Sequence, residues 1–187
     1  MANALLVYAN GSEDLEITAP CDVLKRGGIQ VTRAAICAGH GKAVTLSHGT
    51  QVVCDCNLED VDEIYDVIVI PGGLPGATYC HDSAKLADLL SAQKKANRYI
   101  AAICAAPGFV LAAHGLIGQA KATGYPGCEQ GIANYTGNGV EVVPEAHLIT
   151  GKGPGYALDF ALAILEALTD RRTADSVAAG MLYERRV

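Results

Sequence analysis

The chain has 187 residues, of which half are apolar, and a formal net charge of −6 at pH 7. This length allows one domain with a sizeable core, and we expect a single domain over residues 1–187. No apolar run is long enough to cross a bilayer and no signal sequence is recognisable, which predicts a cytoplasmic protein without a membrane partner. Lys and Arg form no basic stripe, so nucleic-acid binding is not expected as the main activity.

Apolar runs with strand character alternate with helical patterns. In chain order they predict strand Ala4–Ala9, helix Glu13–Arg26, strand Ile29–Ile36, strand Gln51–Cys56, strand Tyr65–Ile70, helix Ser83–Ala96, strand Tyr99–Ile103, helix Ala106–His114, strand His147–Thr150, helix Tyr156–Leu168 and helix Ala174–Tyr183. This order predicts an α/β fold: a doubly wound, mostly parallel sheet with helices on both faces. The run Tyr65–Ile70 (YDVIVI) is typical of a strand buried on both faces.

Three loops follow predicted strands and carry the residues of most chemical interest. They are Asn10–Glu16, Pro71–Gly76 and Cys104–Pro107. Because ligands bind at the carboxyl ends of strands in such sheets, we expect the functional site where these loops meet.

The cysteines do not follow a pattern typical of disulfide scaffolds or zinc sites. Their number is odd and no C-x-x-C pair occurs among Cys21, Cys37, Cys54, Cys56, Cys80, Cys104 and Cys128. Cys54 and Cys56 would face one side of an extended segment, but further zinc ligands at a usable spacing are missing. We therefore expect mostly buried free thiols, no metal and no organic cofactor.

Cys104 lies where the chain changes from strand to helix within two residues, in the sequence IAAICAAPG. Pro107 suits the first helical turn, and the tight turn predicts a strained, exposed position like the nucleophile elbow of hydrolases. The free N–H groups of the following helix should lower the thiol pKa from about 8.5 to ~4–7. Local sequence supports a nucleophile and a buried structural cysteine about equally.

No histidine lies in the three strand-end loops; the five are His40, His48, His81, His114 and His147. A carboxylic acid is therefore the candidate partner of the thiol, and Glu16 is expected in the first turns of the first helix. A protonated Glu16 could donate a hydrogen bond to the thiolate and move protons. Simple enrichment of acids at a helix N-terminus explains Glu16 equally well from composition alone.

Seven segments together resemble one family, in family order over nearly the full chain. They are GSEDLE (11–16), DVLKRGGIQVT (22–32), YDVIVIPGGLPGA (65–77), IAAICAAP (100–107), ATGYP (122–126), ITGKGPG (149–155) and DFALAILEAL (159–168). With these segments the sequence resembles the ThiJ/PfpI superfamily, in the branch of YajL and the parkinsonism-associated protein deglycase.

The resemblance implies a flavodoxin-like fold and a homodimer. It assigns Cys104 as the reactive cysteine and Glu16 as its protonated partner. It also implies an anion-binding hole beside the sulfur, formed by the backbone N–H groups of Gly73, Leu74 and Ala105.

The activities implied are cofactor-independent glyoxalase or deglycase reactions on methylglyoxal, or on its early adducts with proteins and nucleotides, giving lactate. The alternative is an oxidative-stress sensor and redox-regulated chaperone that acts through a Cys104 sulfinate. A related peptidase pattern needs a histidine where Ala105 stands, and an amidotransferase needs a late His-x-Glu, so both are disfavoured.

Three positions depart from the family pattern. Tyr125 replaces a histidine of many relatives, which predicts slower turnover, although the YajL branch also has an aromatic residue there. Lys152 and His48 each replace an arginine. Because neither offers the planar fork of a guanidinium, recognition of anionic groups should differ.

Overall fold

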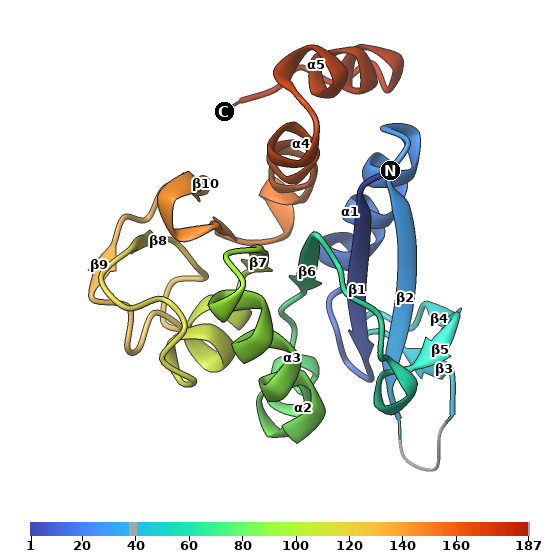
Figure 1. Ribbon diagram of the computed structural model, residues 1–187, viewed down its shortest axis with the longest axis vertical. Coiled ribbons are helices and arrows are strands. Elements are labelled where there is room, and N and C mark those ends of the chain that lie inside the picture. The colour runs from blue at the N-terminus through green and yellow to red at the C-terminus, as the bar shows by residue number, and fades with distance from the viewer. Residues whose placement is uncertain (38–40, 187) are drawn as a thin grey trace.

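The structure is a computed structural model that describes residues 1–37 and 41–186. His40 and the last residue of the predicted domain, Val187, lie outside this part of the chain. The main feature is a seven-stranded sheet (Figure 1). Its spatial order is β10 (Val140–Val143), β11 (Leu148–Gly151), β7 (Tyr99–Ile103), β6 (Val67–Ile70), β1 (Asn3–Ala9), β2 (Gln30–Ile36) and β5 (Cys56–Asn57). Within it β10 alone pairs antiparallel, so the predicted mostly parallel sheet is confirmed.

Helices cover both faces of the sheet, as predicted; Figure 1 shows α4 and α5 above the row of strands and α2 and α3 below it. One face packs against α1 (Asp14–Arg26) and α4 (Ala157–Leu168), with α5 (Arg171–Gly180) against α4. The other packs against α2 (Gly76–Asp82), α3 (Ala84–Lys95) and the π-helix η3 (Pro107–Ala112). Among the described residues no helix is long and apolar enough to span a membrane.

The alternation of side chains along the central strands explains the two cores. On β1, Leu6 and Tyr8 contribute to the core under α1 and α4, whereas Leu5 and Val7 contribute to the core under α3. Every residue of β6 is buried, as its β-branched run predicts. Two-sided burial therefore fixes which strands lie at the centre of the sheet.

The single strand predicted over Gln51–Cys56 is wrong. Its first three residues form β4 (Gln51–Val53), which makes a hairpin with β3 (Ala43–Thr45). Its last residue, Cys56, begins the separate strand β5, which pairs with β2. Between them the Asp55 carboxylate accepts hydrogen bonds from the Arg33 amide (2.9 Å) and guanidinium (2.7 Å) and ties the chain to β2. Cys54 and Cys56 consequently contact different cores and do not face one side.

The helix predicted over Ala106–His114 also differs from the observed one in type and length. The chain forms the short π-helix η3 with Pro107 at its start, as predicted for the proline, but it covers only six residues. At Gly108 the carbonyl of Cys128 approaches so closely that an added Cβ would lie 1.8 Å from its oxygen. The last helix begins at Arg171, earlier than the predicted Ala174, because Asp170 caps it through the Thr173 N–H at 2.7 Å.

Short elements were not predicted at all. The structure adds α2 directly after the Pro71–Pro75 loop, the edge strand β10, and a small pair formed by β8 (Lys121–Ala122) and β9 (Asn134–Tyr135). These elements carry few residues, and their sequences lack the periodicity of the longer elements.

Candidate active site

The three loops expected to form the site do meet. They follow β1, β6 and β7, which are neighbours in the sheet, so their carboxyl ends lie at one edge of the molecule. The loop after β6 packs on the loop after β1: an added Cβ at Gly73 would lie 2.5 Å from the Gly11 oxygen and 2.6 Å from the Glu13 nitrogen. Gly73 has a φ of +82°, a conformation that glycine adopts without strain.

Cys104 occupies the strained turn predicted for it. Its φ of +64° is in the left-handed region, which is unfavourable for a residue with a Cβ. Two backbone hydrogen bonds hold it there: its N–H donates to the Gly151 oxygen (2.9 Å) and its carbonyl accepts from the Tyr125 N–H (2.7 Å). The prediction of an exposed position is wrong, because the residue is only 8 % exposed.

Glu16 lies in the first turn of α1 and is completely buried. Its Oε2 accepts a hydrogen bond of 2.8 Å from the Gly72 N–H, and its carboxyl group interacts with the Cys104 thiol. Burial raises the pKa of Glu16 to about 7, and the charge of Glu13 adds to this rise. A carboxyl group with such a pKa holds its proton in a large fraction of molecules at neutral pH.

The thiol pKa is shifted in the direction opposite to the sequence prediction. Burial raises the pKa of Cys104, and the charge of Glu16 raises it further, whereas hydrogen bonds from the N–H groups of Gly73 and Ala105 lower it. The helix that was expected to stabilise the thiolate is only the six-residue η3. Burial therefore outweighs the helix dipole at this sulfur.

Glu16 and Cys104 behave as one coupled acid pair. When the pair has lost one proton, its charge can lie on the carboxylate or on the sulfur. If Glu16 holds the remaining proton, the charge that opposes thiolate formation is absent, and the N–H groups of Gly73 and Ala105 still stabilise the sulfur. The arrangement thus permits a thiolate only together with a protonated Glu16.

The other predicted site residues lie farther out. The Leu74 side chain, next to Gly73, is largely exposed. Tyr125 and Lys152 line one surface depression of about 470 Å³ together with Pro126 and residues 153–156. The Lys152 ammonium donates a 3.0 Å hydrogen bond to the Gly137 oxygen. The Tyr125 N–H and the oxygen of Gly151, which precedes Lys152, hold the Cys104 backbone.

Sequence reasoning missed the contribution of the β3–β4 hairpin. The His48 N–H donates to Asp14 Oδ2 at 2.8 Å, and the Ser47 N–H donates to the Ser12 oxygen at 2.8 Å. The tip of the hairpin therefore lies on the first turn of α1, next to Glu13. No local pattern marks this contact, because it depends on how the hairpin packs on the sheet.

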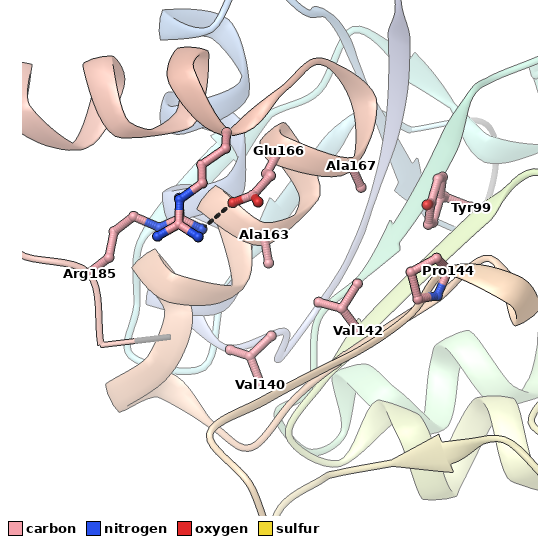
Figure 2. A pocket seen from close by; sticks show the side chains of 9 residues that line it. Tyr99, Val140, Val142, Pro144, Ala163, Glu166, Ala167 and Arg185 are labelled. Atoms are coloured by element: carbon pink, nitrogen blue, oxygen red, sulfur yellow. Dashed lines mark hydrogen bonds and ion pairs between the residues drawn. The ribbon is translucent and has the colours of Figure 1, made fainter.

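A second cavity lies away from this site, at the free edge of the sheet (Figure 2). It has a volume of about 340 Å³ and is bordered by β10, α4 and the C-terminal segment. Arg185 and Glu166 form an ion pair of 2.6 Å at its wall. None of the predicted site residues lines it.

The fold and site define a class: a flavodoxin-like α/β protein with a cysteine on a strand-to-helix elbow and a buried acid beside it. The profile of the DJ-1/PfpI family matches residues 2–167. The chain is 40 % identical over 183 residues to protein dj-1beta of Drosophila melanogaster, covering 96 % of each chain. It is 34 % identical over 177 residues to glutathione-independent glyoxalase DJR-1.2 of Caenorhabditis elegans, covering 92 % of this chain and 91 % of the relative.

Its structure resembles that of oxidized Toxoplasma gondii DJ-1, with a TM-score of 0.93, 36 % identity and coverage of 98 % of this chain and 99 % of the other. The chain belongs to the DJ-1/PfpI family.

Proposed function

We propose that the protein is a cofactor-independent glyoxalase that converts methylglyoxal to lactate at Cys104. The observation that carries the proposal is the buried Glu16 carboxyl group, with a pKa of about 7, in contact with the thiol. A group with this pKa can both give and accept protons at neutral pH. The glyoxalase name of the Caenorhabditis elegans relative supports the same reaction.

The reaction needs no oxidant. The Cys104 thiolate adds to the aldehyde carbon, and the carbonyl oxygen takes the proton of Glu16, which gives a hemithioacetal and leaves Glu16 as a carboxylate. The N–H groups of Gly73 and Ala105, which donate hydrogen bonds to the sulfur, would stabilise negative charge on the oxygen. The Glu16 carboxylate then removes the proton from this carbon and returns it to the neighbouring carbon, while the hydroxyl proton of the hemithioacetal moves to the former ketone oxygen. Water finally hydrolyses the resulting thioester, which releases lactate and the thiol.

The test is lactate formation from methylglyoxal by the purified protein. We expect turnover by the wild type and by Cys128→Ser, a control thiol outside the site, and none by Cys104→Ser or Glu16→Gln. The lactate C2 position should retain substrate hydrogen in D₂O if Glu16 transfers the proton. Turnover by Cys104→Ser would refute the proposal.

We propose deglycation of early methylglyoxal adducts on proteins or nucleotides as an extension of the same reaction. The Cys104 thiolate would then attack the hydroxyl-bearing carbon of a hemithioacetal or hemiaminal adduct, form the same Cys104 hemithioacetal, and release the thiol or amine of the protein or nucleotide in its protonated form. The measurement is adduct loss with and without a scavenger of free methylglyoxal. If the enzyme-dependent loss of adduct disappears when the scavenger is present, the protein removes only free methylglyoxal and does not act on the adduct.

The second candidate is an oxidation sensor, and the oxidized state named for the Toxoplasma gondii structure favours it. Two equivalents of peroxide would convert the Cys104 thiolate to a sulfinate, with water as the reduced product. A protonated Glu16 and the Gly73 and Ala105 N–H groups could hydrogen-bond the sulfinate oxygens. Stoichiometric sulfinate at low peroxide, in a protein without methylglyoxal turnover, would favour this function; chaperone action of the oxidised form is a further proposal.

We propose a homodimer and a reducing, cytoplasmic location. Leu15 on α1 and Val53 on β4 are 58 % and 69 % exposed, so both apolar side chains are available to a second copy of the chain. The odd number of cysteines, with no spacing typical of a disulfide scaffold, supports a reducing compartment. Light scattering should give twice the monomer mass for the wild type and a lower mass for Leu15→Glu; equal masses would contradict the interface.

A further inference from the structure

Glu13 is an acid next to the site that the proposed reaction does not use. Its Oε2 accepts a 2.9 Å hydrogen bond from the Glu16 N–H, so it caps α1. Its own N–H donates to the Gly72 oxygen at 3.1 Å. The Glu13 side chain is only 12 % exposed. A poorly hydrated carboxylate is therefore fixed between the loop after β6 and the turn that carries Glu16.

The charge of Glu13 acts on Glu16 more directly than on the sulfur. Two carboxylates in a poorly hydrated region repel each other, and this repulsion favours the protonated form of the more deeply buried one. Glu13 contributes in this direction to the raised pKa of Glu16. The same repulsion shifts the single negative charge of the Glu16–Cys104 pair toward the sulfur.

The His48 imidazole faces Glu13. Its Nδ1 lies 3.8 Å from Glu13 Oε1 and 3.4 Å from Asp14 Oδ2, on a ring that is 73 % exposed. A protonated His48 would offset the charge of Glu13, whereas a neutral His48 would leave it unopposed.

The titratable groups around Glu16 in the described part of the chain come from three elements. Helix α1 and its cap contribute Glu13 and Asp14, the β3–β4 hairpin contributes His48, and the elbow after β7 contributes Cys104. Asp14 is engaged by the His48 N–H and the Ser47 hydroxyl, so its charge is directed at the hairpin. Glu13 is thus the acid whose charge is directed at Glu16.

We propose that Glu13 is a positioning residue: its negative charge favours the proton on Glu16 and the charge on Cys104, and a protonated His48 weakens this effect. The inference relies on the proposed function only in taking the Cys104 thiolate as the reacting group. It applies equally to attack on an aldehyde and to oxidation by peroxide.

The test is alkylation of Cys104 by iodoacetamide between pH 5 and 9, with the Cys104 peptide quantified by mass spectrometry. Glu13→Gln keeps the oxygen that caps the Glu16 N–H but removes the charge. The acid limb is the part of the profile in which the alkylation rate rises with pH. We expect it to shift to lower pH by about half a unit, because the Glu16–Cys104 pair loses its first proton more easily. The plateau rate should fall about threefold, because more of the charge lies on Glu16.

The matched control is Asp22→Asn, which removes an exposed acid two turns farther along α1. This variant should leave both the acid limb and the plateau of the Cys104 alkylation profile unchanged. A loss of rate in Glu13→Gln without movement of the limb would show a merely structural cap and overturn the proposal.

His48→Lys tests whether a positive charge at this position weakens the effect of Glu13, and it leaves the Glu13 cap of α1 unaltered. Lysine supplies a fixed positive charge, so we expect the acid limb to move in the same direction as in Glu13→Gln, by a smaller amount because the site is exposed. An unchanged profile would remove His48 from the inference. Alkylation does not require methylglyoxal turnover, so a failed glyoxalase assay and a failed Glu13 effect are distinguishable results.

Discussion

The Gly72 amide and the Glu16 carboxyl group are joined by a 2.8 Å hydrogen bond that links the loop after β6 to the first turn of α1. Gly72 also lies against Cys104: an added Cβ would be 2.7 Å from Cys104 Cβ and 2.9 Å from Glu16 Oε2. The acid and the thiol therefore contact one backbone segment that has no side chain. This segment sets the separation of the two groups.

Gly72→Ala should disrupt the site more than the fold. The new methyl group would meet the Ala105 nitrogen at 2.8 Å as well as the two site residues, so backbone must move. We expect a loss of stability of about 2 kcal/mol and a fall in Cys104 alkylation of roughly 10–100-fold. Urea denaturation and the alkylation rate measure the two effects.

Gly180→Ala is the control, because no heavy atom lies within 4 Å of its added Cβ at the end of α5. Its stability should remain within about 0.5 kcal/mol of the wild type, and its alkylation rate should not change. An alkylation rate in Gly72→Ala equal to that of this control would show that the close packing at Gly72 does not position the thiol.

The stability of the protein should depend on pH through Glu16. Its pKa rises to about 7 on folding, so its favourable contribution is complete below the ordinary pKa of glutamate and is lost as the pH rises toward 7. The unfolding free energy of the wild type, relative to Glu16→Gln, should fall by about 3 kcal/mol between pH 4 and pH 8. Urea denaturation of both proteins across this range measures it; a constant difference would mean that the Glu16 pKa is not raised.

Cys104 should tolerate glycine better than alanine. At φ +64° a Cβ is unfavourable, whereas glycine adopts this conformation freely. We expect Cys104→Gly to be more stable than Cys104→Ala by about 1 kcal/mol, the reverse of the usual order of these two residues. Denaturation midpoints of the two variants measure this difference, and a more stable alanine variant would show that the turn is not strained.

The central sheet could be predicted because each of its main strands is a short run of β-branched or apolar residues between helical patterns. The neighbouring positions of β1, β6 and β7 then place Glu16, Gly73 and Cys104 at one edge. Edge elements such as β10 were missed, because three or four half-buried residues do not establish a period. The strand predicted over Gln51–Cys56 failed at Asp55, whose contact with Arg33 depends on tertiary structure.

The chemistry of the site was less predictable than its residues. The turn at Cys104 follows from Ala and Pro at fixed positions, but its burial depends on loops that arrive from residues 72–73, 124–125 and 151. This burial reverses the expected direction of the thiol pKa. The place of His48 beside Glu13 likewise depends on how the β3–β4 hairpin packs, which no local pattern encodes.

The C-terminal segment is tied to α4 through a buried acid. Asp159 is completely buried, and its Oδ2 accepts hydrogen bonds from the Tyr183 hydroxyl (2.7 Å) and from Arg186 Nε (2.9 Å). The Arg186 guanidinium also lies over the Tyr156 ring, with 4.7 Å between its carbon and the ring centroid. This segment therefore neutralises a charge that α4 could not otherwise bury.

Arg186→Met should lower the midpoint of thermal unfolding, because it leaves the Asp159 charge buried without its cation. Asp159→Asn should cost less, since the half-exposed Arg186 side chain can turn to water. In the double variant the two effects should not add, because each substitution removes the same ion pair. Arg172→Met, at an exposed position in the first turn of α5, is the control and should leave the midpoint unchanged. Additive losses in the thermal scans would mean that Asp159 and Arg186 contribute independently, and the buried carboxylate would then need no cation.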